Sequence, residues 1–378
     1  MIELTKKELY LKALRNQEFE ALTWAPNFDW WYRVNKKNNT IPEKYQGLSN
    51  NDLIKKVGGT IWRRVEIIKE SYDKSVKIIT TTKNKGDLQE VKYITPVGEV
   101  STVYSKAHDA SETETMFLSQ HLIKKVEDIK VVKYMVECTH YELDLSSYYK
   151  EIQDVKEDGI VLTCLSCVPY IQVMKTDIGY ENAFYFLADY PDEMNDLINT
   201  YHKKFLESYK LASNSPVEII SNGDNMDYLT CPPDYFKKYA IPYYQDVKNI
   251  LHEKGKLAQG HWCGRTSKLM ELTGDCGLDI VEAITPKPMT DSDIVESLEI
   301  LQGKVVIQGG IPSVLMCNQG GTQQDLINHI ENLLGKIGKR KGFILGMGDN
   351  VPADADFERV AIVSDLVKKF NKEVYNFV

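Results

Sequence analysis

Short apolar runs alternate along most of the chain with longer segments whose apolar residues recur at helical spacing. Seven runs have the length and composition of buried strands: Ala21–Ala25, Gly159–Cys164, Val217–Ser221, Lys256–His261, Leu278–Ile284, Lys304–Gln308 and Gly342–Gly346. Amphipathic helices are predicted between them, including Pro233–Lys254, Thr266–Thr273, Gln323–Ile337 and Phe357–Asn371. Strands that alternate with helices at this spacing predict βαβ units and a parallel sheet.

The number of strands favours an α/β fold of the (β/α)8 TIM-barrel type over an open doubly wound sheet. No glycine-rich dinucleotide fingerprint follows any of the runs, which counts against the open sheet. We expect one domain, residues 1–378. Residues 35–158 fit the alternation poorly and are predicted to form a cap or insertion. Within that range we expect β-structure at Ser75–Thr82 and Val91–Tyr104 and a helix around Ser111–Lys125.

Charge and composition narrow the class of protein. The net charge is −8 and no basic block is present, so nucleic acid is excluded as an expected partner. No apolar run reaches the ~18 residues of a membrane span, and the first residues lack the apolar run of a signal peptide. Seven cysteines without a secretion signal indicate reduced thiols. We therefore expect a cytoplasmic protein that does not contact membranes.

The clearest chemical feature is a histidine two residues before a cysteine at the end of a predicted strand. Side chains at i and i+2 of an extended segment point the same way, so His261 and Cys263 can converge on one metal ion. TIM barrels hold their active sites at this end of the strands, and imidazole and thiolate are zinc ligands. Glu282, at the end of the next predicted strand, and Cys317 are candidate further ligands; the alternative is ordinary packing.

Further candidate residues stand close to predicted strand ends. Asp224 and Asp349 follow two strands beside glycines, and either could orient a substrate, act as acid or base, or cap a helix. Cys164 and Cys167 form an isolated CxxC, which packing explains better than chemistry. Four aromatic residues around the first strand are candidates for binding substrate at the barrel mouth or for core packing: Trp24, Phe28, Trp30 and Trp31.

Several motifs together resemble the uroporphyrinogen decarboxylase superfamily. In the carboxyl-terminal half the resemblance rests on Gly223-Asp224-Asn225, on Gly309-Gly310-Ile311-Pro312 and on the segment Gly346–Pro352. Near the amino terminus, Phe28–Asn35 and Pro42–Tyr45 resemble members associated with corrinoid methyl transfer.

The resemblance implies a TIM barrel that is either a decarboxylase or a methyltransferase. Decarboxylases carry an arginine-rich amino-terminal motif for a substrate with many carboxylates, and here the matching segment offers only Arg33. Methyltransferases carry His-x-Cys and a distant Cys that bind zinc. His261 and Cys263 match, but the place of the distant Cys falls near Gly348. A zinc site would therefore be a variant one, completed by Glu282, Cys317 or Asp349.

The leading hypothesis is thus a methyltransferase that moves a methyl group from a small methylated molecule, such as a methoxyaromatic, to the cobalt(I) of a corrinoid carried by a partner protein. Transfer in the opposite direction, to a zinc-activated thiol, stays open, as does a homodimer. The rivals are a decarboxylase acting on a smaller carboxylated substrate and a non-catalytic barrel that binds a ligand.

Overall fold

Eight parallel strands form the barrel in the computed structural model, which describes residues 4–15, 21–106 and 116–376. Their order around the barrel is β1, β14, β13, β12, β11, β10, β9, β2. Their bounds are β1 (Trp24–Ala25), β2 (Ile61–Val65), β9 (Gly159–Leu165), β10 (Ile219–Asn222), β11 (Leu257–His261), β12 (Ile280–Ile284), β13 (Val306–Ile311) and β14 (Phe343–Met347). Between the end strands β1 and β2, the Thr60 N–H donates to the Trp24 carbonyl (2.7 Å). The predicted (β/α)8 barrel is confirmed.

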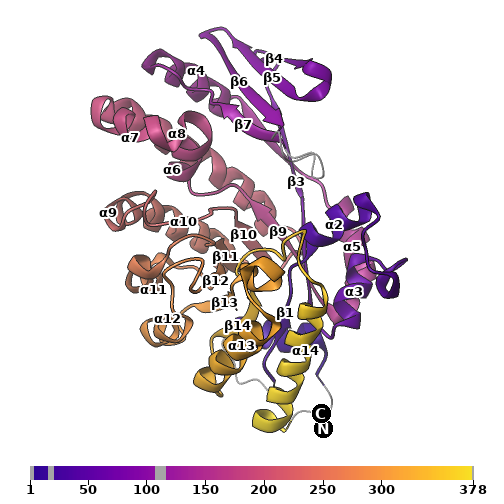
Figure 1. The fold of residues 1–378 in the computed structure, drawn as a ribbon. Helices are drawn as coiled ribbons and strands as arrows, with labels where there is room; N and C mark the ends of the chain where they lie inside the picture. Colours follow the sequence, from indigo (N-terminus) through magenta and orange to yellow (C-terminus); the bar gives the residue numbers. More distant parts are fainter. Residues whose placement is uncertain (1–3, 16–20, 107–115, 377–378) are drawn as a thin grey trace.

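Helices cover the outside of the barrel (Figure 1). Their bounds are α2 (Asp29–Asn38), α3 (Asn50–Lys56), α5 (Ser146–Val155), α6 (Pro169–Ile171), α7 (Tyr180–Asp189), α8 (Pro191–Ser213), α9 (Pro233–Tyr235), α10 (Ile241–His252), α11 (Met270–Cys276), α12 (Ile294–Leu301), α13 (Gln323–Ile337) and α14 (Glu358–Phe370). In the described part of the chain, no helix combines the length and apolar character needed to cross a bilayer.

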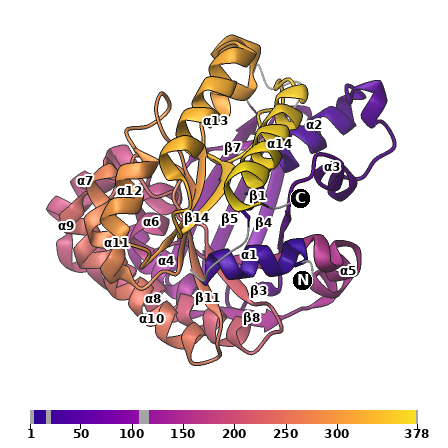
Figure 2. The same ribbon diagram turned by 90° about the horizontal axis from the view of Figure 1, so that it is seen from below.

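The lower end of the barrel is closed by α1 (Lys6–Leu14), seen in Figure 2 from below. Tyr10, Ala13 and Leu14 of α1 belong to one buried cluster with inward-facing strand residues such as Trp62 and Ile219. The Tyr10 hydroxyl donates to Gln308 Oε1 inside the barrel (2.5 Å). With this end filled by apolar side chains, the carboxyl ends of the strands remain as the place for a site.

Two antiparallel sheets are added between β2 and β9. The first pairs β3 (Ile68–Tyr72) with β8 (Thr139–Leu143), and the second contains β4 (Lys77–Lys83), β5 (Leu88–Thr95), β6 (Gly98–Lys106) and β7 (Met116–Gln120). Helix α4 (Val126–Glu137) packs against β6 and against α8. In Figure 1 the second sheet stands at the top, away from the barrel. The range 35–158, predicted as a cap, therefore contains barrel strand β2 as well as these sheets.

One predicted element in this region is wrong. Residues 111–115 of the helix expected around Ser111–Lys125 lie outside the described residues, but Met116–Gln120 forms strand β7. It pairs with β6 in antiparallel register, Lys106 opposite Met116. Hydrogen bonding to the neighbouring strand β6 overrides a weak helical pattern in these five residues. The helix instead begins at Val126.

Candidate metal centre

His261 and Cys263 lie together at the carboxyl end of β11. Between them, Trp262 is fully buried on the outer side of the barrel. Its indole N–H donates to the Tyr244 hydroxyl (3.2 Å), which in turn donates to Asp224 Oδ2 (2.7 Å). Because successive side chains of an extended segment alternate in direction, a fixed Trp262 turns His261 and Cys263 towards the barrel mouth. The predicted convergence of the pair is therefore present.

Asp349 completes a group of three potential ligands. The ligand atoms of His261, Cys263 and Asp349 all lie within 4.8 Å of one another, and among the described residues no other three His, Cys, Asp or Glu side chains were found in such an arrangement. Asp349 follows β14 and has a backbone φ of 117°, a conformation that residues other than glycine rarely adopt. Strain of this kind persists where the surrounding structure enforces it, and it clusters at functional sites.

Glu282 orients the histidine and is not one of the three. Its side chain is 2% exposed, and Oε2 lies 2.7 Å from His261 Nδ1 and 2.8 Å from Arg64 Nη2. The other ring nitrogen, Nε2, lies 3.9 Å from Asp349 Oδ1. Metal-binding histidines commonly hold a carboxylate with the nitrogen that does not bind the metal. In this geometry Asp349 takes the ligand position that the sequence analysis gave to Glu282.

The charges at the site support one another. Burial alone would lower the pKa of His261, but the adjacent Glu282 carboxylate raises that pKa well above its usual value. Burial alone would raise the pKa of Glu282, but the charges of Arg64 and His261 hold it below its usual value. Burial raises the pKa of Asp349, against the opposing effect of His261. Glu282 is thus an anion held by hydrogen bonds from Arg64 and His261, and a buried carboxylate needs such partners.

The match to a family model decides the family. The model for uroporphyrinogen decarboxylase (URO-D) matches residues 120–370. The chain belongs to the uroporphyrinogen decarboxylase family. No curated protein matches this URO-D family member significantly. Among solved structures, a methyltransferase from Methanosarcina mazei has a TM-score of 0.59 and 12% identity, covering 97% of this chain and 99% of that one. A sugar phosphate isomerase/epimerase from Parabacteroides distasonis has a TM-score of 0.38 and 11% identity, covering 92% and 96%.

Asp224 of this URO-D member lies behind the metal centre, fully buried. Besides the Tyr244 hydroxyl, it accepts the Val168 backbone N–H at Oδ1 (2.8 Å). Burial raises the pKa of Asp224 to about 6. The hydrogen bonds from Trp262 to Tyr244 and from Tyr244 to Asp224 fix the backbone position of Trp262, which lies between His261 and Cys263. Its contacts favour a positioning role over the acid–base role that the sequence suggested.

Arg64 is the site residue that the sequence analysis missed. It projects from β2 into the barrel, where its guanidinium lies over the Trp62 ring (4.5 Å to the ring centroid) and donates to Glu282. Its neighbour Arg63 faces away from the barrel interior and pairs with Asp29 and Glu151. No strand was predicted at Ile61–Val65, so nothing in the sequence indicated that Arg64 enters the barrel, where a buried guanidinium needs an anionic partner.

Cys317 and the CxxC cysteines are not part of the group of three. Cys317 lies after β13, with its thiol 3.4 Å from Asp354 Oδ1. Burial raises the pKa values of Cys164 and Cys167, which disfavours the thiolate. All seven cysteines are free.

The predicted aromatic residues are mostly packed in the core. Trp24 donates its indole N–H to the Ser364 hydroxyl on α14 (2.9 Å). Trp31 stacks on Phe357 (4.4 Å between ring centroids), and Phe28 meets the same ring edge-on. Trp30 is half-buried beneath the Arg33 guanidinium (5.0 Å). Burial of Trp24, Phe28 and Trp31 favours the packing interpretation over a role in substrate binding.

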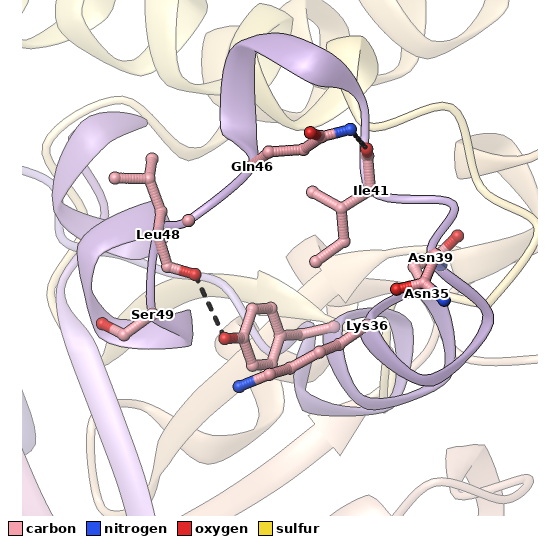
Figure 3. A pocket seen from close by; sticks show the side chains of 9 residues that line it. Asn35, Lys36, Asn39, Ile41, Gln46, Leu48 and Ser49 are labelled. Atoms are coloured by element: carbon pink, nitrogen blue, oxygen red, sulfur yellow. Dashed lines mark hydrogen bonds between the residues drawn. The ribbon is translucent and has the colours of Figure 1, made fainter.

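A cavity of about 470 Å³ lies between α2 and the loop that follows it (Figure 3). Polar groups around it form hydrogen bonds with the neighbouring backbone. The Tyr32 hydroxyl donates to the Leu48 carbonyl (3.1 Å), and the Gln46 amide donates to the Ile41 carbonyl (3.3 Å). None of the metal-centre residues lines it. We therefore do not assign the function of the chain to this cavity.

Proposed function

We propose that this chain is a zinc-assisted methyltransferase that moves a methyl group from a small methylated molecule to the cobalt(I) of a corrinoid protein. The observation that carries the proposal is the convergence of His261, Cys263 and Asp349 at the carboxyl end of the barrel, with Glu282 behind the histidine. An enzyme of the cytoplasm is consistent with seven free thiols.

The three side chains fit zinc by the chemistry of their donor atoms. An imidazole nitrogen, a thiolate sulfur and a carboxylate oxygen are the three donor types that zinc accepts, and catalytic zinc sites use three protein ligands and leave one position open. When bound, zinc would supply a Lewis acid that stabilises negative charge on the atom that loses the methyl group.

The remaining residues of the site orient these ligands through hydrogen bonds. Glu282 accepts from His261 Nδ1 and thereby presents Nε2 to the metal position. Arg64 keeps Glu282 ionised, and Asp224 holds the Tyr244–Trp262 pair that fixes the direction of the ligands. The Cys263 thiol lies 3.5 Å from Asn225 Oδ1, on the loop after β10. The thiol donates a hydrogen bond to this amide oxygen, so Asn225 helps to fix the position of the sulfur.

A corrinoid-binding protein would dock on the same face of the barrel. The cobalt must reach a methyl group held beside His261 and Cys263, so the partner has to approach the carboxyl ends of the strands. Because the partner must leave after each turnover, we expect a transient complex with a modest interface.

The same site disfavours a decarboxylase for a polycarboxylate. Such a substrate needs several unpaired guanidinium groups. Among the described residues at the metal centre, Arg64 is the arginine present, and Glu282 already neutralises it. Arg63 is paired outside the barrel. A pocket with this charge balance favours a methylated substrate that carries few carboxylates.

Metal analysis tests the proposed centre. Protein purified without chelator should contain about one zinc per chain, and His261→Ala, Cys263→Ser and Asp349→Ala should each lower the content strongly. Cys317→Ser is the matched control, since that thiol lies with Asp354 outside the group, and it should keep the wild-type content. Equal zinc in Cys263→Ser and Cys317→Ser, or none in the wild type, would overturn the assignment.

A further inference from the structure

A second cavity, of about 250 Å³, lies where the added sheets meet the barrel. Its walls come from β3, β5, β6, β7 and β8 of the added sheets, from α4 and α8, and from the π-helix η4 (Gln172–Ile178) after β9. Five tyrosines line it: Tyr72, Tyr93, Tyr104, Tyr141 and Tyr201. Tyr72 and Tyr93 meet edge-on, with 6.2 Å between ring centroids. None of these residues belongs to the metal centre.

Asp177 is buried in this wall, and one of its two carboxylate oxygens lacks a hydrogen bond of normal geometry. The residue is 1% exposed, and its Oδ1 accepts from the Gln172 amide (3.0 Å). Its Oδ2 accepts no hydrogen bond of normal geometry among the described residues, although the Tyr201 hydroxyl is close enough to lower the pKa of the carboxyl. Burial raises the pKa of Asp177 to about 7, against the lowering effect of the neighbouring Tyr201 hydroxyl and Gln172. A buried carboxylate normally has a partner, so this oxygen is a place where a ligand would be stabilised.

The ionisable carboxyl groups that line the cavity are not balanced by any basic residue among its described lining. Glu70 on β3 adds a second carboxylate at the more exposed side of the wall. Among the described residues that line the cavity there is no Lys, Arg or His. Aromatic rings attract cations to their faces, and clusters of them are used to recognise quaternary ammonium groups. An anionic ligand would meet two carboxylates without a compensating base.

We propose that this cavity is a binding site for a small organic ammonium ion, with the cation held by the tyrosine rings and paired with Asp177. An inorganic cation would need a cage of several oxygen ligands, whereas ring faces suit a bulky, weakly hydrated cation. The proposal goes beyond the methyltransferase function and does not depend on it, because no lining residue is a metal ligand.

Calorimetry with choline and with its neutral isostere 3,3-dimethylbutan-1-ol tests the proposal. At pH 8, where Asp177 is ionised, choline should bind to the wild-type chain at least ten times more tightly than the alcohol. Asp177→Asn should weaken choline binding at least tenfold and leave the alcohol unchanged. Asp196→Asn, an exposed acid on α8 that pairs with Lys133, is the matched control and should bind like the wild type.

A pair of tyrosine variants checks that the rings take part. Tyr72→Phe keeps a ring and should retain choline binding within about threefold, whereas Tyr72→Leu should lose tenfold or more. Circular dichroism melts of each variant show that it is folded. Equal affinity for choline and the alcohol, or no binding of choline up to millimolar concentration by the folded wild type, would overturn the proposal. Unchanged binding by Asp177→Asn would do the same. None of these measurements tests zinc binding or methyl transfer, so either proposal can be wrong while the other is right.

Discussion

At the scale of single residues, Asp349 combines backbone strain with a ligand position. Its φ of 117° suits glycine, so an aspartate there is explained by what its carboxylate does. We predict that Asp349→Gly stabilises the fold by about 1 kcal/mol, because it removes the strain, while it abolishes zinc binding. Urea unfolding of metal-free protein and metal analysis measure the two effects. A variant that is less stable and still binds zinc would contradict this account of Asp349.

Asp177 gives a pH dependence whose sign is fixed by its environment. Its pKa is raised by burial to about 7, so the folded state keeps a proton that the unfolded chain releases near pH 4. The stability this proton contributes is full below about pH 4 and is lost as the pH rises through 7. The amide in Asp177→Asn does not titrate, so the variant does not lose this stability as the pH rises. The variant should therefore gain stability relative to wild type between pH 5 and pH 8, measured by urea unfolding; a constant difference would refute the assignment.

The sequence predicted the ligand pair but not its surroundings. His261 and Cys263 were predictable because two-residue spacing on a strand fixes a common direction. The pairing of Glu282 with His261 joins the neighbouring strands β12 and β11, whereas its pairing with Arg64 crosses the barrel to β2. The burial of Trp31 against Phe357 likewise joins residues from opposite ends of the chain. Contacts of this range are not encoded in local spacing.

At the scale of elements, local pattern succeeded where the apolar stripe was clean. Helix α13 has the predicted bounds, Gln323–Ile337, and a capping box at Thr322 marks its start. Strand β2 was missed, because Arg63 and Arg64 interrupt its apolar run. One arginine pairs outside the barrel and the other inside it, so both charges are compensated only in the folded chain.

The plug formed by α1 yields a prediction of its own. Tyr10 is fully buried, and its hydroxyl donates to Gln308 Oε1. Tyr10→Phe removes the donor and leaves a buried amide oxygen without its partner, which should destabilise the fold by about 1–3 kcal/mol. Urea unfolding measures the change, with Tyr149→Phe on α5, whose side chain is half exposed, as the control. Equal stabilities of the two variants would show that the hydrogen bond contributes little.

At the scale of the whole molecule, the two proposed sites lie in different parts of the fold. The candidate metal centre lies at the carboxyl ends of the strands, and the tyrosine-lined cavity lies where the added sheets join the barrel. A uroporphyrinogen decarboxylase family fold therefore carries a His–Cys–Asp centre together with an acidic aromatic cavity. The sequence could not predict a cavity here, because its lining combines residues from the added sheets with residues from α4, α8 and η4.

Methyl transfer to cobalt tests the central claim most directly. Zinc-loaded protein would be mixed with cob(I)alamin and either 2-methoxyphenol or tetramethylammonium, and formation of methylcobalamin followed by absorbance. We predict transfer by the wild type and by Cys317→Ala, and a rate at least a hundredfold lower in Cys263→Ala. Equal rates in Cys263→Ala and wild type, or release of carbon dioxide from a carboxylated substrate by the chain alone, would contradict the methyltransferase assignment.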